Sequence, residues 1–587
     1  MSQANQTPIL HSAVRQQLDK LLNHELFTRS DRMARFLRLA VEWTLDGKGE
    51  ELKEYLVGVE VFDRSPEYDP RVDPIVRVEA RRLRSKLKAY YEGDGREDQV
   101  VIEFQRGSYA PRFRTAGETP EAPPSAATIA VLPFVNLSAN PENEYFSDGL
   151  TEELIHALTK APEMRVMAWN TATHFRNRQE DVATIRKQLK VATVLTGSVR
   201  IAGSNLRVRS QLIDTQSGVY LWSETFDREL EDVFAIQEEI ARAIVRTLRG
   251  RLSGGREPAP VAALGRRQTS VAAYNCYLKG RYVWHRRTQD GIRQSVKYFQ
   301  SALEIDPQSA LAQAGLADAY SLMVDYELLP ACEGVPLARE AAEKAVALDP
   351  ELGEAYTSLA LIRGICEWNW EDAERLYQRA IALNPGYATA HFWFACDHLA
   401  VMGQLGEAMA EADKAAELDP LSSIILEGRG QIRMYMGDYE GAIAGYREVL
   451  SFDPGFYKAR ASIGRAYSLM GRYDEALKHL EKARALAGDM TIIVAAVGHV
   501  AGLAGDHGKA RQMLRELEQI AQQRQVASVR FALVHLGLGE IDRALDYLEC
   551  GCERREPSLT SIKVHPIYRP LRGQPRYQEL LRKLRLA

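Results

Sequence analysis

Basic residues recur along one face of a helix that the sequence predicts over residues 75–91. They are separated by four, three and four positions, which keeps them on one side of an α-helix: Arg77, Arg81, Arg84 and Lys88. Side chains of this kind bind DNA phosphates, and arginine also donates two hydrogen bonds to guanine in the major groove. The pattern therefore favours a DNA-binding helix. A solvated basic face that packs on the acidic segment 42–69 is the alternative.

The same predicted helix has an apolar face, which would let it pack on a core while presenting basic residues outward. Its apolar residues recur at intervals of four, three, four and three: Val76, Ala80, Leu83, Leu87 and Tyr90. Residues 71–91 contain seven basic and two acidic residues, a net charge of +5, whereas residues 42–69 carry −6. The net charge of −4 over 587 residues therefore hides a strong segregation of charge.

Two amphipathic helical patterns, at 14–27 and 30–47, precede this helix, and two short strands are predicted after it. Arg106 and Gly107 lie between those strands and predict a turn. Three helices that end in such a hairpin suit a winged helix. In that fold the last helix enters the major groove while a hairpin arginine contacts phosphate or the minor groove.

The sequence RRLRSKL at 81–87, followed by IEFQRGSYAPRF at 102–113, resembles the OmpR-type winged helix. Ser108 stands where that family's hairpin motif has its second glycine. The surrounding block is similar to the N-terminal region of CadC-like and adenylate cyclase-related bacterial proteins. Those proteins join this module to a TolB-amino-terminal-like domain and tetratricopeptide repeats. The resemblance implies five DNA-contacting residues, with the last in the wing: Arg77, Arg81, Arg84, Lys88 and Arg106.

A linker rich in proline and glutamate at 115–123 leads into a segment of mixed pattern at 124–252. Apolar β-branched runs predict strands, the stretch 202–205 predicts a hairpin turn, and 233–252 predicts an amphipathic helix. We expect an α/β domain, which resembles the TolB-amino-terminal or FlgO-like domain. A second predicted helix covers 146–160, with Thr151 as its N-cap. Ser147-Asp148-Gly149 is then a turn at the helix start, or a loop that holds a small ligand.

A period of about 34 residues is visible in the C-terminal half. Five prolines end successive Ala-rich helical stretches, with gaps of 43, 35, 35 and 34: Pro307, Pro350, Pro385, Pro420 and Pro454. Small residues, aromatic residues and turn glycines keep one register within each period. Complete repeats are predicted near 276–307, 354–385, 389–420, 423–454 and 457–488, a repeat with an insertion at 309–350, and weaker helix pairs at 491–522 and 525–553.

This register resembles the tetratricopeptide repeat, so we expect an all-α solenoid over residues 266–587 with a capping helix at its C-terminus. The resemblance implies a concave groove for a protein or peptide partner. Five residues would face that groove by the geometry of the family: Trp393, Asp397, Glu427, Gln431 and Arg465. For each of them, ordinary packing or solvation is the alternative.

Motifs of common enzymes are absent from the sequence, including the phosphate-binding loop, HExxH, GxSxG and the kinase set. No cyclase catalytic domain is recognisable either. We therefore expect no enzymatic activity, no cofactor and no metal site. The six cysteines are too few for a disulfide framework, which indicates a reducing compartment. With no signal peptide and no long apolar run, the sequence predicts a soluble, cytoplasmic protein without a membrane span.

The fold class expected is thus multidomain, with an N-terminal winged helix at 11–114, a central α/β domain and a C-terminal solenoid. The leading hypothesis is a bacterial transcriptional regulator that binds double-stranded DNA and a protein partner. The α/β domain would transmit the signal or dimerise, so a second copy is among the candidate partners. Two alternatives are a non-catalytic scaffold whose N-terminal module binds protein, and a ligand-sensing accessory protein of a signalling enzyme.

Overall fold

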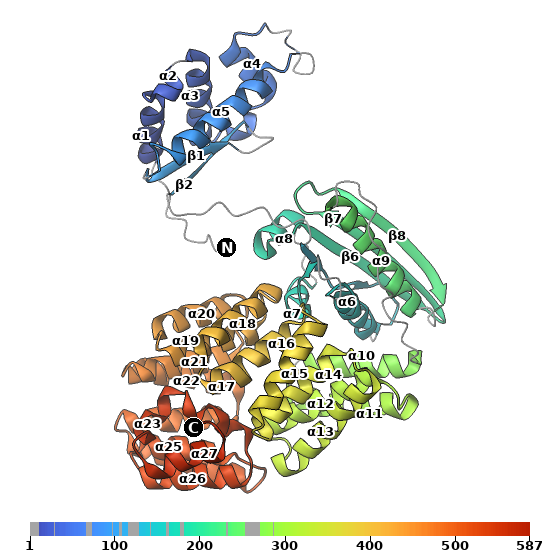
Figure 1. The fold of residues 1–587 in the computed structure, drawn as a ribbon, viewed down its shortest axis with the longest axis vertical. Coiled ribbons are helices and arrows are strands. Elements are labelled where there is room, and N and C mark those ends of the chain that lie inside the picture. Colours follow the sequence, from blue (N-terminus) through green and yellow to red (C-terminus); the bar gives the residue numbers. More distant parts are fainter. Residues whose placement is uncertain are drawn as a thin grey trace. The chain divides into compact units, whose positions relative to one another are not determined.

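The computed structural model divides the chain into two compact units, residues 1–122 and 123–587 (Figure 1). The residues that the structure describes are 11–28, 30–65, 68, 73–96, 98–104, 109–115, 128–140, 143–159, 164–176, 181–229, 233–252, 270–285 and 287–587.

The first unit is a bundle of helices followed by a two-stranded antiparallel sheet. Its helices are α1 (His11–Leu22), α2 (Glu25–Thr28), α3 (Asp31–Leu45), α4 (Glu54–Phe62) and α5 (Ile75–Glu92), with a short 3-10 turn η1 (Gly49–Glu51). The sheet pairs β1 (Val100–Phe104) with β2 (Pro111–Thr115), and Ile102 lies opposite Phe113. Helix α4 is an addition to the three helices that the sequence predicts.

Helix α5 lies on the core of this unit by its predicted apolar face. Val76, Leu83 and Tyr90 are at most 1% exposed and pack in one cluster with Phe27 and Phe36. The prediction of the apolar face is therefore confirmed. Asp73 also supports the start of the helix, because its Oδ1 accepts a hydrogen bond from the Ile75 amide at 3.1 Å.

The second unit begins with a mixed sheet in the order β5-β3-β6-β7-β8, with β4 paired to β6. Its strands are β3 (Thr128–Val131), β4 (Val135–Asn136), β5 (Arg165–Val166), β6 (Thr193–Ala202), β7 (Asn205–Asp214) and β8 (Tyr220–Glu229). β5, β3 and β6 run parallel, whereas β6, β7 and β8 form an antiparallel meander. The predicted turn at 202–205 is confirmed, since Ala202 pairs with Asn205.

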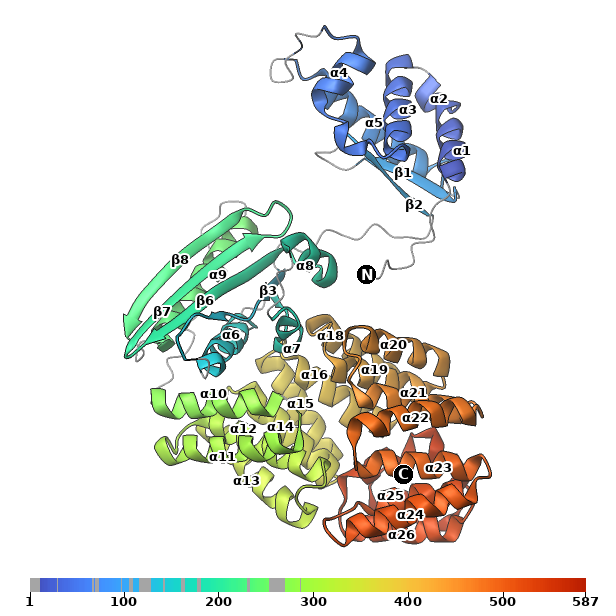
Figure 2. The same cartoon turned by 180° about the vertical axis from the view of Figure 1, so that it is seen from behind.

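Helices cover this sheet on both faces, as the alternation along β3 requires. They are α6 (Glu144–Thr159), α7 (Trp169–Thr173), α8 (Val182–Leu189) and α9 (Val233–Leu252). Ile129 and Val131 join a cluster with α6 and α9, while Ala130 packs with residues of α8. Figure 2 shows α9 against the meander strands.

Two local predictions in this domain are wrong. Ser147, Asp148 and Gly149 lie inside α6 and are buried, because the helix begins at Glu144, ahead of the predicted start. They form neither a turn nor a ligand loop. Thr151 is likewise interior: its Oγ1 donates to the Ser147 carbonyl at 2.8 Å and accepts from the Phe134 amide at 3.0 Å.

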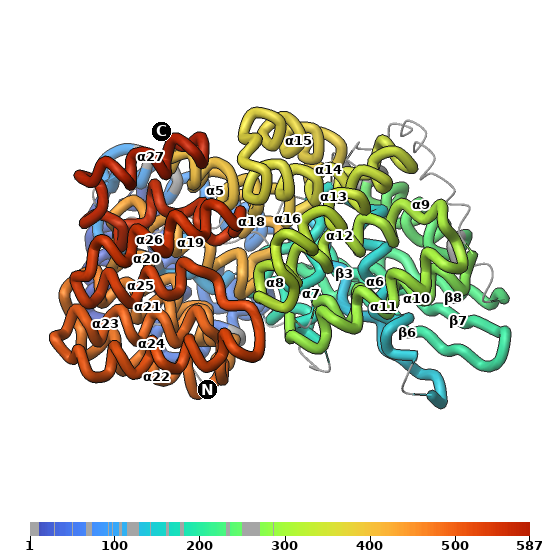
Figure 3. The backbone as a smooth tube through the Cα atoms, turned by 90° about the horizontal axis from the view of Figure 1, so that it is seen from below, coloured from blue at the N-terminus to red at the C-terminus, as the bar shows by residue number. Residues whose placement is uncertain are grey.

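The predicted helix pairs follow as a stack of repeats, seen from below in Figure 3. The first pairs are α10 (Val271–His285) with α11 (Gln289–Ile305), α12 (Ala310–Asp325) with α13 (Ala331–Leu348), and α14 (Gly353–Leu361) with α15 (Trp370–Leu383). The fourth pair joins α16 (Ala388–Trp393) and α17 (Ala400–Met402) to α18 (Leu405–Leu418). Two π-helical stretches interrupt first helices: η4 (Ile362–Cys366) and η5 (Phe394–Leu399).

The remaining pairs continue in the same way. They are α19 (Ser423–Met436) with α20 (Tyr439–Phe452), α21 (Tyr457–Leu469) with α22 (Tyr473–Ala487), α23 (Thr491–Leu503) with α24 (His507–Ala521), and α25 (Ser528–Gly537) with α26 (Ile541–Glu553). The weaker pairs predicted near 491–522 and 525–553 are thus real helix pairs.

Five turn glycines, each with a positive φ between 75° and 88°, occur at every 34th position: Gly403, Gly437, Gly471, Gly505 and Gly539. Each lies just after the first helix of its pair, where a left-handed residue reverses the chain. Because residues with a Cβ rarely adopt this φ, the 34-residue period is a property of the backbone conformation as well as of the side chains.

The chain ends in η6 (Pro557–Lys563), η7 (Pro566–Leu571) and α27 (Pro575–Lys583). These segments bury Leu571, Tyr577 and Leu584 in a cluster that also contains Trp370 of α15. The Trp370 indole Nε1 donates to the Leu584 carbonyl at 2.9 Å. The C-terminal segment therefore does more than cap the last repeat, since it also packs against the third helix pair.

Candidate nucleic-acid interface and repeat surface

The outward face of α5 is centred on different residues from those predicted. Arg77 and Arg81 are exposed, but Arg84 is half-buried at the flank of the helix. The reason is geometric: Arg84 lies one turn after Ala80 and one turn before Leu87, both buried, so it falls beside the apolar face and not opposite it. The face that points directly away from the core carries Val78, Arg81, Arg82 and Ser85, all exposed.

The predicted basic residues are thus only partly brought together on the surface. Arg77 Nε is 2.8 Å from Glu54 Oε1 of α4, so its charge is already balanced within the unit. Arg106 lies outside the described residues, as does the side chain of Lys88. Of the predicted cations that the structure describes, Arg81 is the one that is both exposed and central to the outward face.

Sequence reasoning missed Arg82, whose side chain is 67% exposed and lies next to Arg81. Its Nη1 is 2.6 Å from Glu79 Oε1 one turn earlier. A helical projection centred opposite the whole apolar face, at Ser85, could have found it, because position 82 lies one turn from position 85 on that projection.

A groove of about 740 Å³ runs beside this face and joins α5 to the start of α3. Its cations are Arg32, Arg81, Arg82 and Lys86, and its lining also includes one carboxylate, Glu79. We call this surface the cationic groove. Its apolar lining consists of Met33 and Phe62, each 2% exposed, and the 41%-exposed Val78. The groove therefore offers positive charge beside a small apolar surface.

A polar cluster holds α5 in place behind this surface. The carboxylate of Asp98 accepts hydrogen bonds from Gln17 Nε2 and from the Tyr90 hydroxyl, each at 2.7 Å, and pairs with Lys20. Burial raises the pKa of Asp98, but the hydrogen bonds outweigh it and the net shift is downward. Burial and the same carboxylate raise the pKa of Tyr90 to about 12.

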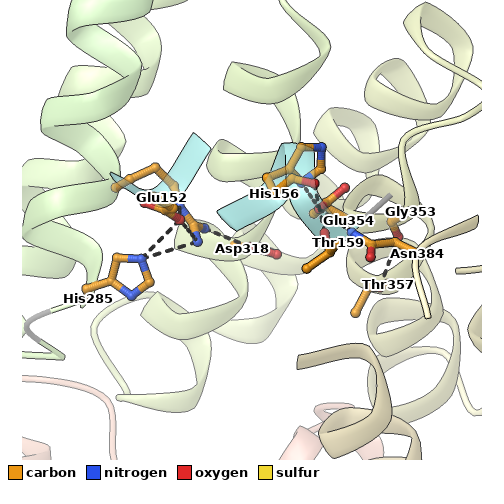
Figure 4. A network of polar contacts seen from close by, with 10 residues as sticks. Glu152, His156, Thr159, His285, Asp318, Gly353, Glu354, Thr357 and Asn384 are labelled. Carbon is orange, nitrogen blue, oxygen red and sulfur yellow. Dashed lines mark hydrogen bonds and ion pairs between the residues drawn. The ribbon is translucent and has the colours of Figure 1, made fainter. Parts of the chain in front are cut away.

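In the second unit, α6 lies against first helices of the early repeats. Arg281 of α10 donates from Nη2 to Glu152 Oε1 of α6 at 2.8 Å, and His285 Nε2 lies 3.2 Å from the same oxygen (Figure 4). Further along α6, His156 Nδ1 is 2.8 Å from Glu354 Oε1 of α14. Helix α6 thus lies against first helices of the first and third repeats, whereas the residues predicted to face a partner lie in later repeats.

The charges of this network are buried and compensated. Burial acts to raise the pKa of Glu152, but Arg281 and His285 outweigh it and hold that pKa far below its usual range. Burial lowers the pKa of His285 and raises that of Asp318 to about 6. The network thus fixes the mixed-sheet domain on the repeats through ion pairs that water barely reaches.

A second polar contact attaches α7 to the turn before α19. Asp419 Oδ1 accepts from the Thr171 amide at 2.8 Å and from the Thr171 hydroxyl at 2.7 Å. Its Oδ2 accepts from Asn170 Nδ2 at 2.8 Å. All of these donors belong to the start of α7, so the mixed-sheet domain is held at two separate places on the solenoid.

The residues predicted to face the groove of the repeats differ in how far they are buried. Trp393 is 8% exposed and packs in a cluster between helices, so it does not line an open surface. Asp397 and Gln431 are half-buried. Burial raises the pKa of Asp397 to about 7. The burial of Trp393 follows from its position in the helix-helix seam, where an aromatic ring fills the space beside small residues.

Glu427 and Arg465 form a local polar contact. Ser462 Oγ donates to Glu427 Oε1 at 2.5 Å, and Arg465 Nη2 donates to that hydroxyl at 2.8 Å. Near them, the rings of Tyr435 in α19 and His565 in η7 are 5.4 Å apart. The C-terminal segment therefore occupies space beside these first helices as well.

Comparison with known proteins gives two family matches. Residues 125–243 match the family described as HilA/YgeH-like transcriptional regulator, second domain. Residues 433–495 match a tetratricopeptide repeat family. The mixed-sheet domain is therefore a regulator-type domain, and the repeats are tetratricopeptide repeats. The finer likeness to the TolB-amino-terminal domain stays a prediction.

Two curated relatives cover parts of the chain. It is 37% identical over 202 residues to "Putative adenylate cyclase 3" of Rhizobium meliloti, covering 34% of each protein. It is 23% identical over 305 residues to "Transcriptional regulator HilA" of Salmonella typhimurium, covering 51% of this chain and 53% of that one. The chain thus spans about a third and about half the lengths of these relatives.

Solved structures resemble the repeats only loosely. The human IFIT1 dimer with m7Gppp-AAAA covers 59% of this chain and 77% of its own at 16% identity, with a TM-score of 0.39. YrrB, described as a TPR protein with an unusual peptide-binding site, gives a TM-score of 0.24 at 20% identity, covering 34% and 96%. Among the helices of the described residues, none combines the length and the hydropathy that a transmembrane span requires.

Proposed function

We propose that this chain is a non-catalytic transcriptional regulator whose first unit is a winged helix that binds duplex DNA. The proposal rests on one observation above all: α5 presents Arg81 and Arg82 on the face directly opposite its core contacts. A hairpin follows α5, as in a winged helix, and the next domain matches a regulator family. The cationic groove adds Arg32, an exposed cation at the start of α3, for phosphate contact.

Within this proposal, Arg81, Arg82 and Ser85 are the residues placed to reach base edges, and Arg77 and Arg84 serve at the flanks. Val78 suits van der Waals contact with a thymine methyl group. The tetratricopeptide repeats supply the protein-interaction part of the regulator. A partner that uses the first helices of the early repeats must accommodate α6, which already lies against them.

The experiment is a salt titration of binding between the full chain and a mixed-sequence duplex. For the double variant Arg81→Glu/Arg82→Glu we expect a lower affinity and a smaller dependence of that affinity on salt. Each phosphate contact removed lowers the salt slope by about 0.9. The double variant Arg543→Glu/Arg582→Glu, an equal charge change at exposed residues of α26 and α27, serves as the control. Binding that is absent, insensitive to salt, or unchanged in the double variant contradicts the proposal.

An adaptor function is the second candidate, because part of the lining of the cationic groove is apolar and would also fit an acidic amphipathic helix. Val78→Ser separates the two functions. The substitution replaces the exposed apolar side chain of the groove with a polar one, so it weakens capture of an acidic helix while leaving the phosphate-dependent salt slope. We expect the salt slope to survive in this variant, with circular dichroism as the check that the unit remains folded.

A further inference from the structure

The mixed sheet ends at β8, and the outer edge of this strand carries no partner strand among the described residues. β8 spans ten residues and pairs with β7 on its inner side. The paired residues run from Asn205 opposite Glu229 to Ile213 opposite Tyr220. An edge of this length exposes a row of amide and carbonyl groups that can pair with another strand. A second strand placed there would continue the sheet.

Exposure along β8 is high. Ser223, Glu224 and Thr225 are exposed, as are Asp227, Arg228 and Glu229, whereas Phe226 between them is 3% exposed. Val219 and Tyr220, just before and at the start of the strand, are each 58% exposed. Leu221 has no partner on β7, since the register shifts there. This irregularity leaves the stretch from Trp222 to Glu229 as the regular part of the edge.

The charge pattern of this stretch is complementary to itself. If two copies of β8 run antiparallel with Phe226 opposite Phe226, then Glu224 of each copy lies opposite Arg228 of the other. Thr225 lies opposite Asp227, so no like charges face each other. Centring the pairing on Glu224 or Asp227 instead places two carboxylates directly opposite, which is unfavourable. Centring the pairing on Thr225 places Glu224 of each copy opposite the phenyl ring of Phe226 in the other copy.

The charges of Glu224 and Arg228 are available for pairing with a second copy. Asp227 is already paired on the inner side, because Arg207 of β7 donates from Nε to its Oδ1 at 2.5 Å. Arg228 Nη1 donates at 3.0 Å to the Asp227 carbonyl next to it, an exposed contact that still leaves the rest of its guanidinium in solvent. Glu224 is exposed at the edge opposite Ser210 of β7. The edge thus presents Glu224 two positions before Phe226 and Arg228 two positions after it.

We propose that β8 pairs with β8 of a second copy of this chain, in the register centred on Phe226, and so joins two mixed sheets across a twofold axis. An isologous contact of this kind is self-limiting, because each copy uses its β8 edge once. The proposal does not depend on DNA binding. Mass in solution tests it directly, whatever the first unit recognises.

The test is analytical ultracentrifugation of the full chain across a range of concentrations. We expect a reversible monomer–dimer equilibrium. Glu224→Arg brings two cations opposite each other, and Arg228→Glu brings two carboxylates opposite each other, so each variant alone should weaken the dimer about tenfold or more. An equimolar mixture of the two variants should dimerise again, because every pair across the axis is then oppositely charged. Glu239→Arg, an exposed position on α9, is the control and should dimerise normally.

Three results overturn the proposal. The first is a wild-type chain that stays monomeric at every concentration. The second is a dimer that neither substitution weakens. The third is a mixture of the two variants that remains as monomeric as each variant alone. Near-native circular dichroism of both variants is required for the comparison, and the mixture provides its own proof of folding, since unfolded chains cannot restore the dimer.

Discussion

At the scale of single residues, the first unit depends on a buried carboxylate. Asp98 is 7% exposed and receives hydrogen bonds from residues far apart in the sequence, Gln17 and Tyr90. It thereby links α1 to α5 and to the strand that follows. Because hydrogen bonds to a charged group are stronger than neutral ones, the orientation of α5 depends on Asp98 being ionised.

We predict that Asp98→Asn destabilises the first unit by about 1.5–3 kcal/mol at neutral pH. The pKa of Asp98 is lowered in the folded protein, so its contribution is present above its unfolded value of about 3.9 and is lost as the pH falls through the folded pKa. Hydrogen exchange of α5 amides in the full chain measures the effect. The matched variant Asp94→Asn, with a side chain 79% exposed, should change little. Equal protection in all three proteins would rule out this role.

At the scale of elements, each helix pair from the fourth to the last is closed by a turn whose backbone conformation needs glycine. Gly437 has a φ of 87°, and no atom lies within 4 Å of the place where a Cβ would stand, so the backbone alone accounts for its identity. Gly445, eight residues later in α20, also has free space around it but no positive φ. The two positions differ in conformation and not in crowding, which makes them a natural pair for comparison.

We predict opposite effects of alanine at these two positions. Gly437→Ala should destabilise the second unit by about 1–2 kcal/mol, because an alanine is forced into the left-handed region. Gly445→Ala should stabilise it by about 0.5–1 kcal/mol, since alanine lowers the entropy cost of forming the helix. Thermal unfolding of the full chain compares them. A stabilising or neutral Gly437→Ala would show that the turn does not require the conformation seen here.

At the scale of the whole molecule, the solenoid and the mixed-sheet domain are coupled through charges buried between them. Arg281 is 12% exposed, and it balances Glu152 of α6 at 2.8 Å and Asp318 of α12 at 3.7 Å. Removing one member of such a network leaves an uncompensated charge, which costs more than the interaction itself contributes. The second unit should therefore unfold as one body.

We predict that Arg281→Met lowers the stability of the second unit by about 3–5 kcal/mol. The double variant Arg281→Met/Glu152→Gln should recover part of the lost stability, because a neutral amide then replaces the carboxylate that Arg281 no longer balances. Arg375→Met, with a side chain 72% exposed on α15, should cost less than about 0.5 kcal/mol. Urea unfolding followed by tryptophan fluorescence tests this. Two separate transitions in the wild type, beyond that of the first unit, would contradict the coupling.

Much of the architecture was predictable because it is local. The 34-residue period, the helix pairs, the apolar face of α5 and the hairpin turn at 202–205 all follow from short-range patterns of side chains. The candidate site was only half predictable. Arg81 is where the pattern places it, but Arg84 is at the flank, and Arg82 became visible only once the core contacts of α5 defined its outward direction.

The sequence by itself determined the repeats, the segregation of charge and the residue types available for DNA binding, since these depend on neighbours within a few turns of the chain. Only the tertiary structure decided that Arg77 is balanced by Glu54, that α6 lies against first helices of the early repeats, and that the C-terminal segment reaches back to Trp370. These contacts join residues 23 to 214 positions apart. No local pattern encodes such pairings, because they depend on how packed elements meet in space.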